Sequence, residues 1–283
     1  MKPIVTIILC LLLLEAQAQP LRVDLYLGAA NYQGDLQTKR FSLTEAKPAV
    51  GLGLSYDITN KLIIRGAASY MKVSGRDQQG TAAKDVAFRN LSFRSSILEA
   101  QLGLEYNLLD IEERGFTPYV FAGVAAFHFN PYAFDAAGNK VFLRSLSTEG
   151  QGLTQYPEKK PYANNQFAIP FGGGIKMALT DKLQIGLELG LRKLFTDYLD
   201  DVSGTYADST ILAGARGVQA AAFAFRGSEI PGSTAYPAAG ARRGNPANKD
   251  WYYVTALRIS YSLGSRNGSG GKRSKLGCPT GVY

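Results

Sequence analysis

The chain has 283 residues, a formal net charge of +8, and 31 glycines, 16 tyrosines and 14 phenylalanines. This length fits one β-barrel or two ordinary domains. A disulfide framework is excluded, because one of the two cysteines, Cys10, lies in the first apolar run and leaves Cys278 alone. The last twenty residues carry Arg266, Lys272, Arg273 and Lys275 and no acidic side chain, so this basic tail either binds acidic partners or anionic lipid or is a solvated end. We expect no nucleic-acid partner.

The first eighteen residues have the pattern of a secretory signal peptide. Lys2 precedes an apolar run over 4–14, and Ala16, Gln17 and Ala18 form a small-residue cleavage site. The run is too short for a membrane-spanning helix. We therefore expect residues 1–18 to be a signal peptide that is removed on export.

Eight later segments alternate apolar and polar side chains, which predicts β-strands. The segments are roughly 21–31, 47–57, 61–72, 95–107, 116–128, 167–179, 182–195 and 250–263. The most regular one places Leu183, Ile185, Leu187, Leu189 and Leu191 on a single face. Such a long strand is typical of a transmembrane barrel, and a long strand of a soluble sandwich is the alternative for this segment alone.

Two further features of these segments concern which way the side chains face. In segment 116–128 we expect Tyr119, Phe121 and Phe127 on the lipid face and His128 on the inner face. Aromatic residues gather at segment ends, as the interfacial girdles of a barrel require.

The connections between the segments alternate in length. Short links at 57–61, 108–115 and 180–181 alternate with connections of about 15, 22, 38 and 54 residues. Outer-membrane barrels have short periplasmic turns and long external loops, whereas a soluble meander has no reason to alternate. We predict an all-β fold, an eight-stranded antiparallel transmembrane barrel over residues 19–263, with both ends in the periplasm.

The inward positions of the strands carry equal numbers of acids and bases. An eight-stranded barrel is just wide enough for side chains to fill it, so buried charges there must pair. We expect a closed lumen, and a polar water path is the alternative. The predicted ion-pair network consists of Asp24, Arg65, Glu99, Glu105, Lys176, Glu188, Arg192 and Arg258.

Few residues suggest chemistry. His128 with an acid partner among Asp197, Asp200 and Asp201 would resemble the mouth site of an outer-membrane enzyme, but no G-x-S-x-G motif is present. The acidic stretch 197–201 either binds calcium or forms a solvated acidic turn. Gly172, Gly173 and Gly174 lie within a strand and permit curvature or close packing. We predict no catalytic, metal or cofactor site, and no enzyme.

Seven blocks of sequence carry a resemblance to a known family. The blocks are NYQGDL (31–36), PAVGL (48–52), RNLSFRS (89–95), TPYVFAGVAAFHFNP (117–131), STEGQG (147–152), IPFGGGIK (169–176) and RKLFTDYLDDVSGTY (192–206). Taken together they resemble the PorG-type outer-membrane barrel of the type IX secretion system. This resemblance implies a non-enzymatic component of protein secretion, linked to gliding in some bacteria, that contacts the periplasmic ring of PorK and PorN.

The resemblance does not extend to the Ala/Gly/Arg-rich loop 207–249 or to the basic tail 264–283. We expect the loop to lack helices and strands and the tail to be flexible. The expected ring contacts are Asp110, Glu112 and Glu113 in one periplasmic turn and Lys272, Arg273 and Lys275 in the tail. The alternative function is a general envelope or surface-binding barrel that meets lipopolysaccharide or other cells.

Overall fold

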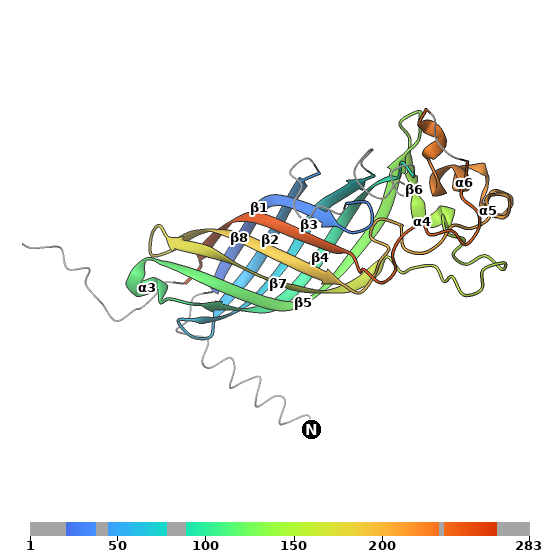
Figure 1. The fold of residues 1–283 in the computed structure, drawn as a ribbon. Coiled ribbons are helices and arrows are strands. Elements are labelled where there is room, and N and C mark those ends of the chain that lie inside the picture. The colour runs from blue at the N-terminus through green and yellow to red at the C-terminus, as the bar shows by residue number, and fades with distance from the viewer. Residues whose placement is uncertain (1–20, 38–44, 78–88, 232–234, 265–283) are drawn as a thin grey trace, which may run out of the picture.

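Eight long antiparallel strands close into a barrel in the computed structural model, which describes residues 21–37, 45–77, 89–231 and 235–264 (Figure 1). The barrel strands are β1 (Leu21–Gln33), β2 (Lys47–Asp57), β3 (Leu62–Arg76), β4 (Ser92–Asn107), β5 (Phe116–Phe134), β7 (Asn165–Ala178), β8 (Leu183–Leu194) and β9 (Trp251–Ser262). Each strand pairs with its neighbours, β1 pairs with β9, and the β4–β5 pairing completes the ring. The short strand β6 (Lys140–Phe142) adds only to the outer part of β5. This architecture confirms the predicted fold class.

Both described ends of the chain lie at one end of the barrel, together with the short turns (Figure 1). Arg22 near the start of β1 pairs with Ser262 at the end of β9. The long connections lie at the opposite end. We call these the short-turn end and the long-loop end. The expected signal peptide, both cysteines and the expected contacts Lys272, Arg273 and Lys275 lie outside the described residues.

The outer surface of the barrel is apolar. Large aliphatic side chains that are more than half exposed occur on several strands, for example Leu52, Leu102, Ile175 and Leu187. Water would make such a surface very unfavourable, whereas lipid suits it, and a closed barrel leaves no unpaired strand edge in the bilayer. The protein is therefore a membrane-spanning barrel of the outer-membrane type. Among the described residues, the helices are all too short or too polar to cross a bilayer.

The predicted facing of β5 was wrong. Tyr119, Phe121 and Phe127 are buried in the lumen, while Val120 and Val124 are 50% and 63% exposed. His128 has the outward parity and is exposed. The aromatic residues suggested a lipid-facing girdle, but they fill the barrel interior. The outward positions include small residues such as Ala122 and Ala126, so in the sequence the outer face of β5 looks less hydrophobic than the inner face.

Helices were not predicted in the connections, but one short link and two long connections contain them. The helices are α3 (Ile111–Arg114), α4 (Leu143–Leu146), α5 (Ser209–Arg216), α6 (Val218–Ala224) and the 3-10 helix η2 (Gly227–Glu229). Helix α5 begins where the Asp208 side chain accepts hydrogen bonds from the amides of Thr210 and Ile211, and it ends at Gly217 with a φ of 88°. Loop 207–249 is thus partly helical, contrary to expectation.

One hydrophobic core extends from the part of the lumen near the long-loop end into the long connections. Ile97, Phe129 and Leu194 of the strands belong to the same buried cluster as Leu212 of α5 and Phe223 of α6. We use the term outer module for the described residues of connections 135–164 and 195–250. Because it shares the barrel core, the outer module is a packed structure that continues the barrel at the long-loop end (Figure 1).

Candidate functional site

The eight charged residues expected in the lumen all face inward and are buried. Alternation along each strand places them on the inner face, opposite the exposed aliphatic row. The exposed fraction of each residue is 5% or less. Isolated ions at such positions would be very costly, so their partners decide whether the lumen is stable.

Arg65 lies at the centre of the network and joins opposite walls of the barrel. Its Nη1 and Nη2 atoms donate to the Glu188 carboxylate at 2.7 and 2.9 Å, and Nη1 lies 3.2 Å from Glu105. Tyr119 donates to the same Glu188 carboxylate at 2.9 Å. The Phe121 ring lies 4.3 Å from the Arg65 guanidinium carbon. Two aromatic residues of β5 therefore contact the charged groups directly, Tyr119 through a hydrogen bond and Phe121 through its ring face.

A second group surrounds Arg258. Its guanidinium donates to Asp24 at 3.0 Å and to Glu105 at 2.5 Å. Lys176 donates to the other oxygen of Glu105 at 2.5 Å. The Glu105 carboxylate thus accepts charge-assisted hydrogen bonds from three cations on three different strands, Arg65, Lys176 and Arg258.

Arg192 and Glu99 form a separate pair nearer the long-loop end. Arg192 donates to Glu99 at 3.1 and 3.3 Å, and the Tyr252 hydroxyl donates to Glu99 at 2.5 Å. Sequence reasoning missed one more pair at the short-turn end, Arg22 with Asp57. Both of these residues have the inward parity of their strands, so the alternation could have identified them.

The described side chains of the inner face lie close together around the charged groups. A cavity between Tyr26, Met71, Glu188 and Arg192 has a volume of about 20 Å³. That volume holds roughly one water molecule. A glycine helps this packing, because a Cβ atom at Gly174 would lie 2.8 Å from the Tyr119 hydroxyl. The inner face thus combines charge pairing with dense filling.

The acidic stretch 197–201 is buried and does not form the solvated turn that we expected. Asp197, Asp200 and Asp201 are at most 2% exposed. The Tyr32 hydroxyl donates to Asp200 at 2.5 Å and lies 3.3 Å from Asp250. Burial raises the pKa of Asp200 and of Asp250 well above the usual carboxyl range.

The other two carboxyl groups of the stretch differ in their partners. Thr148 and Tyr162 donate to Asp201 at 2.5 and 2.7 Å, and burial raises the pKa of Asp201 to about 6. Among the described residues, neither carboxylate oxygen of Asp197 makes a hydrogen bond of normal geometry. Burial raises the pKa of Asp197 to about 7, although the nearby Ser203 lowers it. Within the described part of the chain, no group of three or more His, Cys, Asp or Glu side chains is arranged to hold a metal ion.

Arg243 ties loop 207–249 into the outer module. It donates to Glu149 at 3.0 Å and to the carbonyl of Asp201 at 2.5 Å. The partner Glu149 accepts from the amides of Ser203 and Gly204 as well. These contacts explain why the Ala/Gly-rich loop folds, although its composition suggests an irregular connection.

The remaining predicted residues lie on the surface. Asp110 accepts from the Glu112 amide at the start of α3 and from Asn60 of the neighbouring short turn at 3.2 Å. Glu112 and Glu113 are exposed beside it at the short-turn end. His128 Nδ1 lies 2.7 Å from the Asn165 side-chain oxygen, to which it can donate a hydrogen bond, on the outer wall and away from the buried aspartates. The structure does not bring His128 and residues 197–201 into one site.

Several solved outer-membrane barrels resemble this chain in structure. The attachment invasion locus protein Ail of Yersinia pestis shows 8% identity and a TM-score of 0.41, covering 87% of this chain and 99% of its own. A major outer membrane protein of Thermus thermophilus shows 11% identity and a TM-score of 0.42, with coverages of 87% and 100%. OprG of Pseudomonas aeruginosa shows 11% identity and a TM-score of 0.39, with coverages of 88% and 97%.

Sequence comparison gives a family without an assigned activity. No curated protein matches the chain. Residues 1–216 match the family described as a domain of unknown function, DUF6089. This match spans the expected signal peptide, most of the barrel and the buried acidic stretch. The chain belongs to the DUF6089 family.

Proposed function

We propose that the protein is a non-enzymatic, non-conducting outer-membrane anchor that acts through the two ends of its barrel. The closed lumen carries this proposal, because paired charges and aromatic side chains fill the space that a pore or an internal binding site would need. With the interior occupied, binding surfaces are available at the short-turn end, at the long-loop end and on the lipid-facing wall.

At the finer level, we propose that it is a component of the type IX secretion machinery that contacts the PorK/PorN ring. In this proposal residues 1–18 are removed on export, the short-turn end faces the periplasm, and the tail 264–283 extends from it. The seven sequence blocks that resemble the PorG-type barrel support the assignment. The exposed carboxylates of Glu112 and Glu113 give the short-turn end a surface that can orient a charged partner.

Co-purification tests the ring contact. Wild-type protein extracted from native membranes in mild detergent should retain PorK and PorN. The double variant Glu112→Lys/Glu113→Lys should lose most of this retention, because it reverses two charges on the docking surface. The control is Glu158→Lys, which reverses an exposed carboxylate of the outer module. If the control variant loses PorK and PorN while the α3 variant retains them, docking does not use the short-turn end and the proposal is wrong.

The outer module favours a second candidate function, that of a general envelope or surface-binding barrel. Its helices, buried ion pair and shared core give it a fixed shape, which suits recognition of molecules outside the cell. In this case deletion of the chain would leave type IX export intact and would change attachment or envelope integrity. Measuring secreted cargo in a deletion strain separates the two candidates.

A further inference from the structure

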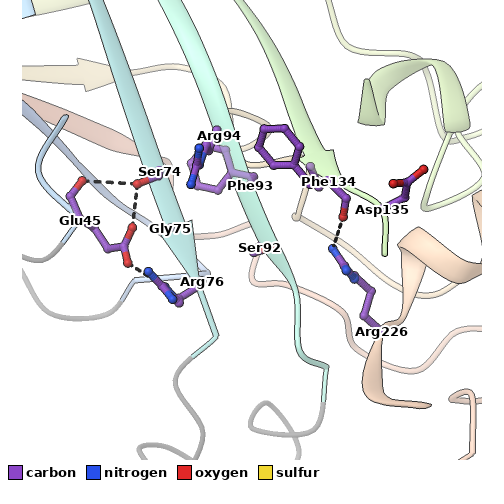
Figure 2. A pocket seen from close by; sticks show the side chains of 11 residues that line it. Glu45, Ser74, Gly75, Arg76, Ser92, Phe93, Arg94, Phe134, Asp135 and Arg226 are labelled. Carbon is purple, nitrogen blue, oxygen red and sulfur yellow. Dashed lines mark hydrogen bonds and ion pairs between the residues drawn. The ribbon is translucent and has the colours of Figure 1, made fainter. Parts of the chain in front are cut away.

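The outer wall above the apolar belt on β3, β4 and β5 carries a basic groove. The groove has a volume of about 330 Å³, and its lining includes the last residues of β3, the first residues of β4 and the last residues of β5 (Figure 2). Its basic lining residues are Arg76 from β3, Arg94 from β4 and Arg226 next to α6. Lys140 of β6 flanks it, because Lys140 pairs with the lining residue Phe134.

The register of the strands places this groove directly above the lipid-facing surface. Tyr70 and Leu98 are paired across β3 and β4, and both are about half exposed on the outer wall. Further along the same outward parity come Lys72 and then Arg76 on β3, with Arg94 on β4. The change from aliphatic to basic side chains therefore occurs at the height where the lipid headgroups begin.

The arginines of the groove keep donors available for a ligand. Arg94 makes no ion pair with any described carboxylate, and its guanidinium carbon lies 5.1 Å from the centre of the Phe134 ring. The Nε atom of Arg76 donates to Glu45 at 2.7 Å, yet the Arg76 side chain is 66% exposed. Each guanidinium has five N–H donors, so one such contact leaves most of them free to bind phosphate oxygens.

The carboxylates of the groove are already engaged. Glu45 accepts from Ser74 at 2.7 Å in addition to Arg76. Asp135 accepts from the amides of Ala137 and Asn139 in its own turn. Glu229 accepts from Arg226 at 2.8 Å, and Arg226 also donates to the Phe134 carbonyl at 3.0 Å. Arg226 is thus fixed in place, while Arg76 lies beside Glu45 and Arg94 lies beside Phe93 and Phe134 (Figure 2).

We propose that this groove binds the phosphorylated headgroup of an outer-leaflet lipid whose acyl chains lie along the apolar wall of β3–β5. Charge complementarity and continuity with the lipid-facing surface identify the occupant as a lipid. The guanidinium groups of Arg76 and Arg94 bind the phosphate, and Lys140, which lies 3.9 Å above the Tyr132 ring, adds positive charge at the edge. This site is independent of the proposed ring contact, because it lies at the opposite end of the barrel.

Lipid retention tests the proposal. Full-length protein is reconstituted in phosphatidylcholine nanodiscs that contain a minor fraction of the bisphosphorylated glycolipid lipid A. It is then transferred to neutral detergent and examined by native mass spectrometry. We expect the wild type to retain bound lipid A and Arg76→Gln/Arg94→Gln to retain at least about tenfold less, since two charge-assisted contacts are removed. The matched control Lys193→Gln/Lys249→Gln removes two exposed cations elsewhere and should retain as much as the wild type.

Two further arms identify the recognised group. The wild type should retain dephosphorylated lipid A about as poorly as the double variant retains lipid A. Inorganic phosphate alone should not displace lipid A from the wild type. Equal retention of lipid A by the wild type and Arg76→Gln/Arg94→Gln would overturn the proposal. Equal retention of the dephosphorylated lipid, or displacement of lipid A by inorganic phosphate, would also overturn it, because the first excludes phosphate recognition and the second makes the acyl chains unnecessary.

Discussion

The guanidinium of Arg65 on β3 and the carboxylate of Glu188 on β8 meet across the barrel lumen, with two donor–acceptor distances of 2.7 and 2.9 Å. These strands are separated by β2, β1 and β9 around the ring, so the pair connects opposite walls. A pair in this position blocks the lumen and also links the two opposite walls of the barrel.

Removing one partner of a lumen pair should strongly destabilise the barrel. Glu188→Ala leaves Arg65 without its bidentate partner, and Arg192→Ala leaves Glu99 without its cation. We expect each to lower the free energy of unfolding by about 3–5 kcal/mol, because an uncompensated buried charge remains. Denaturant unfolding in lipid vesicles measures this. Glu113→Ala, at an exposed carboxylate, should change the value by no more than about 0.5 kcal/mol.

The lipid-facing row of β8 can be tested at Leu187, which is 56% exposed on the outer wall. Leu187→Arg should cost about 2–4 kcal/mol of folding free energy near the bilayer midplane, because the charge has to be placed in lipid. Leu187→Gln should cost less, since its side chain is polar but uncharged. If the Arg variant folds into bilayers as stably as the wild type, Leu187 does not face lipid.

The outer module should be more stable in mild acid than at neutral pH. The pKa of Asp197 is raised by burial to about 7, and the charged groups around it include Asp35, Glu149, Asp200, Asp250 and Lys249. An unfolded aspartate titrates near about 3.9, so the folded module holds a proton that the unfolded chain releases between these values. The stabilising contribution is therefore full below about pH 4, falls as pH rises toward about 7, and changes no further above that.

Hydrogen exchange at residues 197–203 measures this effect after correction for intrinsic exchange. Protection in the wild type should be greater at about pH 5 than at about pH 8. Asp197→Asn cannot ionise and should remove this part of the pH dependence. A wild-type profile that runs parallel to that of Asp197→Asn would show that Asp197 is ionised in both states and would contradict the account.

The sequence was sufficient for the barrel but not for everything placed upon it. Strict alternation, as in the Leu183–Leu191 row, depends only on local strand geometry and lipid, so most strand ends could be predicted to within a few residues. The exception is β5, which continues to Phe134, whereas the predicted segment ends at 128. In β5 the alternation was found, but the choice of the lipid-facing side was wrong. The aromatic side chains of Tyr119 and Phe127 lie on the inner face, and which face points inward depends on what fills the lumen. Inward parity did identify charged positions, but their actual partners, such as Arg65 with Glu188, depend on the closure of the barrel.

The outer module was the larger omission. Residues 197–201 look like a solvated acidic turn in the sequence, since carboxylates are rarely buried without partners. Only the fold brings Tyr32, Thr148 and Arg243 to that stretch from distant parts of the chain. One local signal was available: Asp208 before an alanine-rich run, with Gly217 after it, marks the start and end of α5.

Ion conductance in planar lipid bilayers tests the central claim, a closed and ion-paired lumen, most directly. Purified full-length protein should insert and show no steady conductance steps, because Arg65, Arg258 and Glu105 lie paired in its interior. Arg65→Ala/Glu188→Ala, which removes the pair that joins opposite walls, provides a comparison in which leakage is expected if the barrel still folds. A reproducible, large conductance in the wild type would contradict the closed-barrel account and would favour a polar water path through the lumen.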